Sequence, residues 1–414
     1  MTINENAIRP TETMTGDLDA QAWSMPSQYE CQSCGAGPMA VFYEMKNVPV
    51  HSCLLLHDRE QALDFPKRDI ALGFCRVCGF IQNVLFDASM LRYSSAYEEQ
   101  QSFSPRFNVF AEKLAEDLIE RYQLRQKQII EIGCGKGDFL VLISKLGQNR
   151  GVGVDPSYIP QRVQAEGVRF IEDFYGERYS HLQGDLICCR HTLEHIPDTH
   201  RFVATVRTSV GDRQDSVIFF EVPDIGRVLR EIAFWDIYYE HCSYFSLGSL
   251  ARLFRATGFD VIRLAKAFDD QYLLLDAVPA KGKTKPRLRE EDDFEELSRE
   301  VEFFAANYSA RLGEWRNRID SIRQKHQRAA IWGSGSKCVA FLSTLGIGDE
   351  LEMIVDINPH RHGKYLAGSG KRISAPRALI EYRPDVVIIM NPIYREEIRQ
   401  ELEDMGLSPQ LIAV

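Results

Sequence analysis

The sequence predicts an α/β protein organised around a doubly wound parallel sheet. The first sign is the run 129–140, in which an apolar strand leads through three alternating glycines into an apolar helix. Two Cys-x-x-Cys-Gly motifs near the N-terminus predict a metal-binding module. A second strand and glycine loop at 329–337 predicts another α/β unit. We therefore expect a four-cysteine module, a central α/β domain and a smaller, Rossmann-like C-terminal domain.

The composition and net charge of the chain limit the classes of partner that it is expected to bind. The 414 residues are enough for two or three domains, and a hydrophobic content of 44% is enough for packed cores. A net charge of −10 disfavours a general nucleic-acid binder, because contacts to phosphates need clustered Lys and Arg. The sequence contains no signal-peptide core and no run of about 18 apolar residues. We expect a cytoplasmic protein with neither a membrane nor a nucleic-acid partner, and we interpret the polar residues 1–28 as a disordered tail.

The first structured element is expected at residues 29–95, around the paired cysteines. Two Cys-x-x-Cys-Gly motifs are the sequence form of a tetrahedral four-thiolate zinc site. Four thiolates leave no coordination position for water, so such a zinc ion would be structural. An iron–sulfur cluster, a redox pair and unrelated buried thiols remain open as alternatives. The predicted ligands are Cys31, Cys34, Cys75 and Cys78. Three further residues between the motifs are interpreted as structural or as lining a neighbouring pocket, namely His51, Cys53 and His57.

The linking segment, residues 86–108, mixes aromatic and polar side chains without a clear period. That composition is typical of a segment that lines a polar pocket, and a plain connecting loop is an equally good interpretation. Residues 110–122 then have helical spacing and lead into the central glycine loop. The central domain is expected to extend over residues 96–280.

The glycine loop is predicted to hold a positively charged nucleoside ligand. Alternating glycines let a ligand approach the backbone, and the helix behind them presents unpaired N–H groups. Asp155 ends the next strand, where a carboxylate suits two ribose hydroxyls. A NAD-binding fold is disfavoured because its loop is typically G-x-G-x-x-G and because Glu131 would sit badly beside a pyrophosphate. The expected ligand-binding residues are Glu131, Gly133, Gly135, Gly137 and Asp155.

The strands that follow bring further polar residues to the same edge. Residues 168–171 form a short strand before Asp173, and residues 184–190 form another that leads to His191 and His195. Either histidine could instead cap a helix or pack in the core. The central sheet and its helices are expected to continue with a strand at 216–222, an amphipathic helix at 249–257 and a strand at 272–278.

Residues 235–246 form the most unusual cluster, with five aromatic side chains, two carboxylates and a histidine. A histidine with a phenol and a carboxylate within three positions can transfer a proton near neutral pH and hold an oxyanion. Tyr238, Glu240 and His241 are the predicted members of this site. The alternative is a structural aromatic segment with a solvated His–Glu pair.

The last expected domain covers residues 281–414. A charged stretch at 280–293 is interpreted as a boundary rather than a binding site, and residues 294–327 are interpreted as a long charged helix. A second strand-to-glycine-loop pattern then predicts the smaller Rossmann-like half. Its strands and loop are expected at 329–337, 353–359 and 384–390.

The order of these motifs resembles a known family. The loop from Glu131 to Gly137 matches the E/D-x-G-x-G-x-G motif of class I S-adenosylmethionine-dependent methyltransferases. With the four-cysteine module, the Tyr-x-Glu-His-x-x-Tyr-Phe segment and a C-terminal Val-Asp-x-Asn-Pro, the chain after its tail resembles the zinc-containing sugar C-methyltransferases. Those enzymes methylate C3 of nucleotide-linked 4-keto-6-deoxysugars in antibiotic pathways. The resemblance implies S-adenosylmethionine as methyl donor, a structural Zn²⁺, and a nucleotide-linked sugar between the central and C-terminal domains.

The resemblance also implies roles for individual residues. A carbon becomes nucleophilic when a proton next to a carbonyl is removed, so the enzyme needs a base and a group that holds the enolate oxygen. His241 would be the base, Tyr238 or His195 would hydrogen-bond the enolate, and Glu240 would orient its neighbours. The donor would contact Asp173, Phe174 and His191, and the sugar would contact Tyr93, Tyr97 and Lys337.

Two departures from the family pattern fall in the C-terminal domain. Cys338 follows Lys337 where the family usually has glycine, and 390–393 reads Met-Asn-Pro-Ile where the family tends to show Pro-Trp-Asn. An O- or N-methyltransferase acting on another small metabolite therefore remains an alternative, as does a non-catalytic protein that binds zinc and a nucleotide. We expect a monomer or a homodimer.

Overall fold

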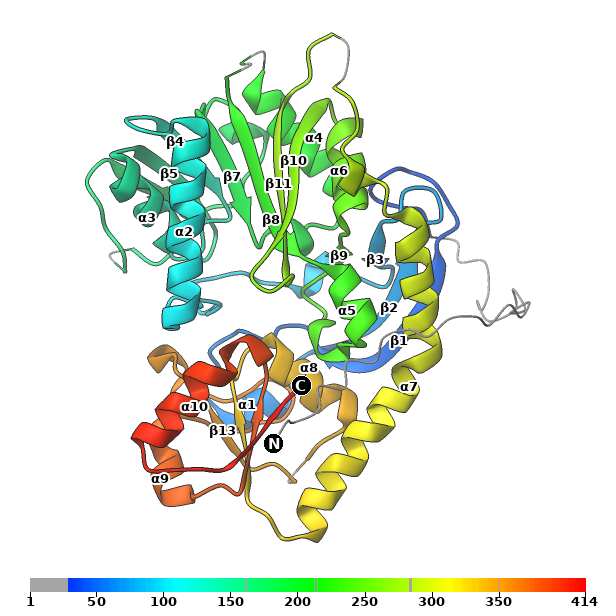
Figure 1. The fold of residues 1–414 in the computed structure, drawn as a ribbon, viewed down its shortest axis with the longest axis vertical. Helices are drawn as coiled ribbons and strands as arrows, with labels where there is room; N and C mark the ends of the chain where they lie inside the picture. The colour runs from blue at the N-terminus through cyan, green and yellow to red at the C-terminus, as the bar shows by residue number, and fades with distance from the viewer. Residues whose placement is uncertain (1–28, 161, 212, 214, 283–284, 349) are drawn as a thin grey trace, which may run out of the picture.

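The described chain forms three β-sheets with helices packed around them (Figure 1). The computed structural model describes residues 29–160, 162–211, 213, 215–282, 285–348 and 350–414. The tail expected at residues 1–28 lies outside the described residues. Parallel strands alternate with helices through most of the central and C-terminal parts, which confirms the predicted α/β class.

The central sheet has seven strands in the order β10-β11-β8-β7-β4-β5-β6. The strands from β6 to β8 pair in parallel, whereas β11 pairs antiparallel with both β8 and β10. Strand order reverses between β4 and β7, and doubly wound sheets bind their ligands at such a switch point. The strands are β4 (Gln128–Ile132), β5 (Arg150–Val154), β6 (Val168–Ile171), β7 (Leu186–Arg190), β8 (Val217–Pro223), β10 (Phe259–Ala267) and β11 (Tyr272–Pro279).

Helices cover both faces of the central sheet, because successive strand residues point to opposite faces. Ile129 packs with α2 and α3, whereas Ile130 packs in the cluster that contains α4 and α6. Helix α6 begins earlier than expected because the Ser246 hydroxyl accepts a hydrogen bond from the Ser249 N–H and caps it. The four helices are α2 (Pro105–Tyr122), α3 (Asp138–Gly147), α4 (Thr199–Val210) and α6 (Leu247–Ala256).

The N-terminal module is an antiparallel sheet that the central part of the chain completes. Strands β1 (Ala40–Pro49), β2 (Lys67–Phe74) and β3 (Ile81–Asn83) pair in that order, and β3 also pairs with β9 (Ser243–Tyr244). Because β9 begins two residues after His241, this pairing fixes the His241 segment against the module.

The C-terminal sheet has five strands in the order β14-β13-β12-β15-β16, all paired in parallel. The long helix α7 (Phe294–Gln324) precedes it and runs beside both halves of the molecule in Figure 1. This helix ends before residue 327 because His326 adopts a left-handed conformation with φ of 52°. The remaining elements of this part are β12 (Ala329–Trp332), α8 (Ser336–Leu345), β13 (Met353–Val355), β14 (Ile373–Ser374), α9 (Leu379–Tyr382), β15 (Val386–Ile389), α10 (Arg395–Asp404) and β16 (Gln410–Ala413).

Short helices occupy many of the connections. Two are α-helical, and eight are single turns of 3₁₀-helix among the described residues. They are α1 (Arg59–Leu63), α5 (Ile225–Glu231), η1 (Ala88–Met90), η2 (Glu177–Tyr179), η3 (Leu193–His195), η4 (Phe234–Asp236), η5 (Arg289–Glu291), η6 (Pro359–Arg361), η7 (Pro376–Ala378) and η8 (Pro392–Tyr394).

One hydrophobic core is shared by the N-terminal module, α7 and the C-terminal sheet. Phe42 and Tyr43 on β1 contact Phe304 on α7, with ring centroids 6.1 and 5.5 Å apart. Phe234 on η4 stacks on Phe341 of α8 at 6.1 Å. The module, the segment before His241 and the C-terminal part are therefore packed together rather than loosely tethered.

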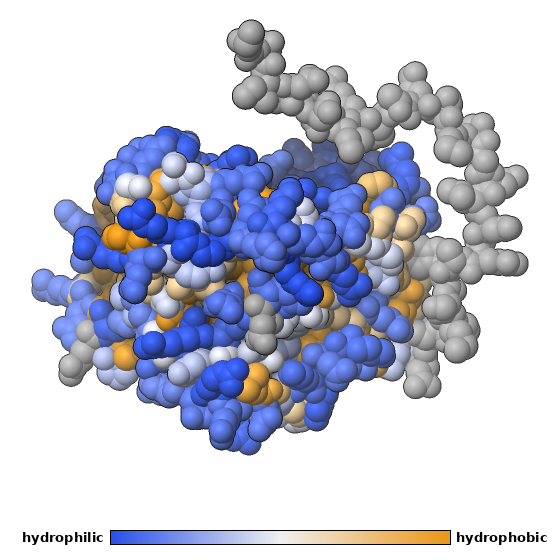
Figure 2. Space-filling model, turned by 90° about the horizontal axis from the view of Figure 1, so that it is seen from below, coloured by the Kyte–Doolittle hydropathy of each residue, from blue (hydrophilic) through white to orange (hydrophobic). Residues whose placement is uncertain are grey.

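The face of the molecule that is seen from below is mainly polar (Figure 2). Figure 2 shows hydrophilic residues over most of the face seen from below, with hydrophobic residues scattered between them. No helix among the described residues is long and apolar enough to cross a membrane.

Candidate active site

A large cavity of about 720 Å³ lies between the carboxyl ends of the parallel strands of the central sheet and those of the C-terminal sheet. The central sheet contributes the residues after β4, β5, β7 and β8, and the C-terminal sheet contributes those after β12, β13 and β15. The linking segment and the His241 segment line the cavity as well. Parallel α/β sheets bind ligands at these strand ends, so the fold alone makes this cavity the candidate site.

The glycine loop forms one end of the cavity. Gly133, Gly135 and Gly137 have φ values of 68°, 54° and 95°, a conformation that side chains disfavour. A Cβ atom on Gly135 would lie 2.7 Å from the Glu99 carboxylate. The Asp155 carboxylate accepts a hydrogen bond from the Gly135 N–H at 2.8 Å, which ties the loop to the end of β5.

Acidic side chains gather around this loop. Burial, together with the charges of Asp155 and Asp138, raises the pKa of Glu131 to about 8 against the opposing charge of Arg190. Burial also raises the pKa of Glu99 to about 7, although the neighbouring Lys136 lowers it. One oxygen of each of these two glutamates is buried without a hydrogen-bond partner among the described residues. A cationic ligand would stabilise the charged forms of both buried carboxylates, whereas a phosphate would repel them.

The other residues predicted to bind the donor lie in different surroundings. Phe174 lines the cavity and is 58% exposed, so its ring is available to a ligand. Asp173 is absent from the described residues that line the cavity, and its carboxylate accepts hydrogen bonds from Arg178 and Tyr179. His191 lines the cavity with φ of 49° and lies 2.9 Å from a Glu221 oxygen.

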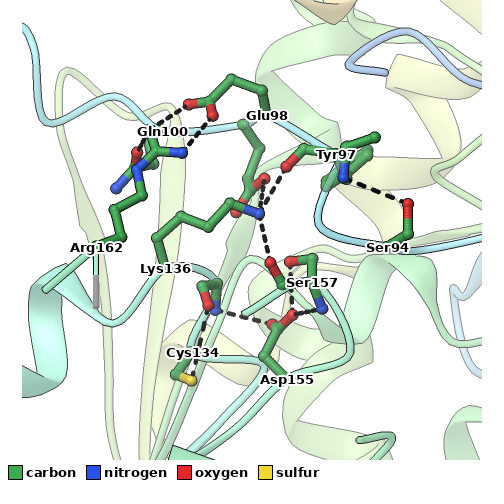
Figure 3. A network of polar contacts seen from close by, with 12 residues as sticks. Ser94, Tyr97, Glu98, Gln100, Cys134, Lys136, Asp155, Ser157 and Arg162 are labelled. Atoms are coloured by element: carbon green, nitrogen blue, oxygen red, sulfur yellow. Dashed lines mark hydrogen bonds and ion pairs between the residues drawn. The ribbon is translucent and has the colours of Figure 1, made fainter. Parts of the chain in front are cut away.

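A buried lysine joins the glycine loop to the linking segment. Lys136 is 1% exposed, and its Nζ donates to the carbonyl oxygens of Tyr97 at 2.6 Å and Ser157 at 2.7 Å. Figure 3 shows the lysine side chain between these two backbones, with Asp155 on the Ser157 side. The segment that carries Tyr93 and Tyr97 is thereby fastened across the donor end of the cavity.

Glu98 extends this network to the C-terminal part. It is buried, and its carboxylate accepts two hydrogen bonds from Arg162 at 2.8 and 3.1 Å (Figure 3). Asn358 donates to the same carboxylate at 2.9 Å, and Arg361 donates to the Glu98 carbonyl oxygen. Burial raises the pKa of Glu98, but Arg162 and Asn358 outweigh it and lower the pKa below its ordinary value.

His241 and Tyr238 stand together in the cavity wall. Their ring centroids are 4.2 Å apart, and His195 lies 4.7 Å from His241. Burial lowers the pKa of His241 well below 6.5, and the charges of His195 and His191 add to this effect. Burial raises the pKa of Tyr238 well above 10. At neutral pH the site therefore offers a neutral imidazole that can accept a proton and a phenol that can donate a hydrogen bond.

Tyr93 and Tyr97 lie against this group. The Tyr93 hydroxyl is 2.9 Å from Nδ1 of His195, and the two tyrosine rings are 5.1 Å apart. Nδ1 of His195 also lies 3.1 Å from the Glu240 carbonyl oxygen. A carbonyl oxygen can only accept, so this contact places a proton on Nδ1 of His195.

Glu240 faces away from the cavity. His51 Nδ1 lies 2.6 Å from its carboxylate, and the Ser52 N–H and hydroxyl both donate to it. The described residues that line the cavity do not include Glu240. His51 is accordingly a partner of Glu240, whereas Cys53 lines the cavity, 3.2 Å from the Ser336 hydroxyl.

The glycine loop of the C-terminal sheet repeats the arrangement of the first loop. The Ser334 N–H donates to Asp356 at the end of β13 at 2.7 Å, as Gly135 does to Asp155. Lys337 lines the cavity, and its Nζ contacts Asp236, which Arg227 also contacts at 2.6 Å. Both parallel sheets thus present a loop and a carboxylate to one cavity.

Several residues that line the cavity or support its wall could not be found from sequence patterns. Glu98 is one acidic residue in a polar segment and belongs to no motif. Arg361 follows the Val-Asp-x-Asn-Pro motif without belonging to it. Glu194 lies in sequence between two histidines, which are stronger candidates by residue type. Only the Asp356 and Asn358 positions carried a signal, because that motif ends a predicted strand.

The four predicted zinc ligands form a compact cluster outside the cavity. The sulfur atoms of Cys31 and Cys78 are 3.6 Å apart, those of Cys34 and Cys75 are 3.7 Å apart, and all four lie within 4.8 Å of one another. A tetrahedral ion with zinc–sulfur bonds of about 2.3 Å requires sulfur–sulfur distances of about 3.8 Å. The thiols therefore fit such an ion.

Two family models match the chain. Residues 106–264 match a methyltransferase domain, and residues 281–408 match the C-terminal domain of C-methyltransferases. A curated relative, the C-methyltransferase NovU from Streptomyces niveus, is 28% identical over 303 residues, which are 69% of this chain and 71% of the relative.

Solved structures also resemble part of the chain. A putative S-adenosylmethionine-dependent methyltransferase from Listeria monocytogenes is 10% identical, with a TM-score of 0.33 over 42% of this chain and 100% of its own. The 1,6-didemethyltoxoflavin-N1-methyltransferase of Burkholderia thailandensis, solved with its substrate and S-adenosylhomocysteine, is 19% identical, with a TM-score of 0.33 over 43% of this chain and 82% of its own.

Proposed function

The chain is a class I S-adenosylmethionine-dependent C-methyltransferase, and from this premise we propose that it methylates a carbon of a nucleotide-linked keto-deoxysugar through an enolate. One observation carries the proposal. A single cavity joins an acidic glycine loop, suited to a cationic donor, to a neutral histidine and a phenol suited to enolate chemistry. The C-terminal loop at the same cavity offers a place for the nucleotide.

The donor end is assigned to the first glycine loop. S-adenosylmethionine, when bound, supplies an electrophilic methyl group to the carbon that deprotonation activates. Glu131 and Glu99 offset its positive charges, Asp155 holds the ribose, and the glycines allow close approach. Phe174 packs on the adenine, and His191 lies beside the donor. Asp173 would need to leave Arg178 and Tyr179 to contribute, so we assign it a supporting role.

The acceptor end is assigned to the His241 group. His241 removes the proton next to the ketone, since its imidazole is neutral at neutral pH. Tyr238 donates a hydrogen bond to the enolate oxygen. His195 holds its proton toward the Glu240 carbonyl, so it positions Tyr93 rather than donating to the enolate. Glu240 positions the segment through His51 and Ser52.

The C-terminal part is assigned to the nucleotide. Its strand order, numbered along the chain, is 3-2-1-4-5, which matches the first five strands of the Rossmann order 3-2-1-4-5-6. We propose domains at 29–95, 96–280 and 281–414, with the sugar under Tyr93 and Tyr97 and the nucleotide near Lys337. The Cys31–Cys78 cluster is assigned to a structural Zn²⁺ that fixes the N-terminal module.

The test measures exchange of the α-proton, which is the proton on the carbon next to the ketone. In deuterated water with S-adenosylhomocysteine and a nucleotide-linked 4-keto-6-deoxysugar, the wild type should exchange that proton without methyl transfer. His241→Gln should slow both exchange and methylation by roughly 10²–10⁴-fold, the usual contribution of a general base. His200→Gln, on the exposed surface of α4, is the matched control and should behave as wild type.

Three outcomes would change the proposal. Wild-type methylation by His241→Gln would move the base to Nε2 of His195. A new methyl group on oxygen or nitrogen, with no proton exchange, would replace carbon methylation by O- or N-methylation. Absence of S-adenosylmethionine binding by calorimetry would contradict the donor site itself.

A further inference from the structure

Glu194 is a buried carboxylate without an assigned task. It lines the cavity, it is 2% exposed, and neither of its oxygens has a hydrogen-bond partner among the described residues. Buried carboxylates are normally paired, because an uncompensated charge away from water is costly. Such a group beside a reaction centre needs a functional explanation.

The backbone places Glu194 beside His241. The Cys242 N–H donates to the Glu194 carbonyl oxygen at 2.9 Å, and His195 Nδ1 lies 3.1 Å from the Glu240 carbonyl oxygen. These two contacts fasten η3 to the residues on either side of His241. As a result, one side-chain ligand atom from each of Glu194, His195 and His241 lies within 4.8 Å of the others.

We propose that Glu194 is the carboxylate that stabilises the imidazolium ion formed when His241 removes the α-proton. This inference rests on the function proposed above. In that step the substrate C–H bond breaks, an N–H bond forms on His241, and the electron pair remains on the substrate as the enolate. The positive charge that appears on a buried ring needs a nearby negative charge, and Glu240 does not supply it because His51 and Ser52 hold its carboxylate.

His191 is a second histidine close to the Glu194 carboxylate. His191 Nδ1 lies 3.6 Å from a Glu194 oxygen. Burial lowers the pKa of His191, but Glu221 and Glu194 outweigh it and raise the pKa to about 9. Glu194 thus lies close to both a charged His191 and a neutral His241, and proton transfer to His241 adds a second cation near it. The titratable groups around His241 are Glu194, His195, His191, Tyr238, Tyr244 and, through His195, Tyr93.

The first test needs no acceptor. Full-length protein carrying ¹³Cε1-labelled histidine would be titrated by NMR, with the His191 and His241 signals assigned from His191→Gln and His241→Gln. Removing the charge with Glu194→Gln disfavours both imidazolium forms, so both titration midpoints should fall by about 0.5 pH unit or more. The control Glu116→Gln, on the exposed face of α2, should move neither. Unchanged midpoints in Glu194→Gln would overturn the proposal.

The second test uses turnover. His241 must be neutral to act, so the acid limb of kcat/KM reports its pKa. Glu194→Gln should move that limb to lower pH and reduce kcat and α-proton exchange together, by roughly 10–10²-fold, with the donor KM unchanged. A lower rate with an unmoved limb would mark a merely structural role and refute the proposal.

A metal requirement would also refute it. If EDTA abolished activity and Mn²⁺ restored it in the wild type but not in Glu194→Gln, the three residues would be a cation site instead. Failure of every sugar acceptor would contradict the proposed function alone, because the NMR result does not depend on the acceptor.

Discussion

The conformation and contacts of single residues decide what the glycine loop at 133–137 can bind. Gly135 has φ of 54°, and a side chain there would meet Glu99, so Gly135→Val should block the donor. Asp155→Ala should weaken binding by about 1–3 kcal/mol, the scale of hydrogen bonds to a charged acceptor. Calorimetric titration with S-adenosylhomocysteine would measure both. Unchanged affinity in both variants would place the donor elsewhere.

His191 makes stability depend on pH. Its pKa is raised from 6.5 to about 9, so its contribution to folding is fully present below about pH 6.5 and is lost as pH rises through 9. The wild type should therefore lose more thermal stability between pH 7 and pH 9.5 than His191→Gln, by roughly 1–3 kcal/mol. Melting temperatures of the two proteins at both pH values would show the difference, and parallel losses would contradict it.

Positions that depend on local sequence could be predicted, and those that depend on tertiary contacts could not. The donor loop and Asp155 follow strands, and a strand end fixes where a side chain lies. His241 and Tyr238 could be predicted because a histidine and a phenol occur together in one short segment. Glu240 is adjacent to His241 in sequence, but His51 from the N-terminal module draws its carboxylate away from the cavity. Glu194 could be recognised only from the structure, in which both oxygens of its carboxylate are buried without a hydrogen-bond partner among the described residues.

At the scale of elements, the linking segment is the part that sequence patterns described least well. Its composition left a pocket wall and a plain loop equally open, because neither has a periodicity. Three basic side chains from other parts of the chain hold this irregular segment in place through hydrogen bonds. They are Lys136, Arg162 and Arg361. Several regular elements, such as α6, β11 and β12, were by contrast expected close to their observed places, because apolar periodicity encodes them directly.

This fastening predicts a measurable coupling. Glu98→Gln keeps the shape of the side chain but leaves Arg162 without its counter-charge, and breaking one side of a buried ion pair is strongly destabilising. Backbone amides of residues 93–104 should exchange with deuterium at least about 10-fold faster, and S-adenosylhomocysteine should protect residues 356–362 less than in the wild type. Hydrogen-exchange mass spectrometry with and without that ligand would measure both effects.

The matched control is Glu112→Gln, an exposed position on α2. Both proteins should have the same secondary structure by circular dichroism. Equal exchange rates in Glu98→Gln and the control would mean that Lys136 and Arg361 hold the linking segment without Glu98.

At the scale of the whole molecule, the N-terminal module joins the other two parts. Its sheet pairs with β9 on one side, while Phe42 and Tyr43 pack on α7 on the other. The Tyr365 N–H also donates to the Leu56 carbonyl oxygen at 2.9 Å, which ties the module to the C-terminal part directly. The cysteine motifs predicted the module itself, but no sequence pattern could predict these partners, since they depend on contacts between distant segments.

These contacts determine how the protein should respond to loss of the metal. A metal ion bound by four thiolates contributes folding energy to its module, so Cys78→Ser or chelation should remove that stabilisation. Because the module shares its core with the C-terminal part, both should unfold in one transition rather than two. Each kcal/mol lost moves a melting temperature by roughly 2–4 °C in a domain of 150–250 residues, so a drop of roughly 5–10 °C is expected. Calorimetry would record this transition, and elemental analysis should find one zinc per chain in the wild type. Iron in place of zinc, or an early transition confined to the module, would contradict this account.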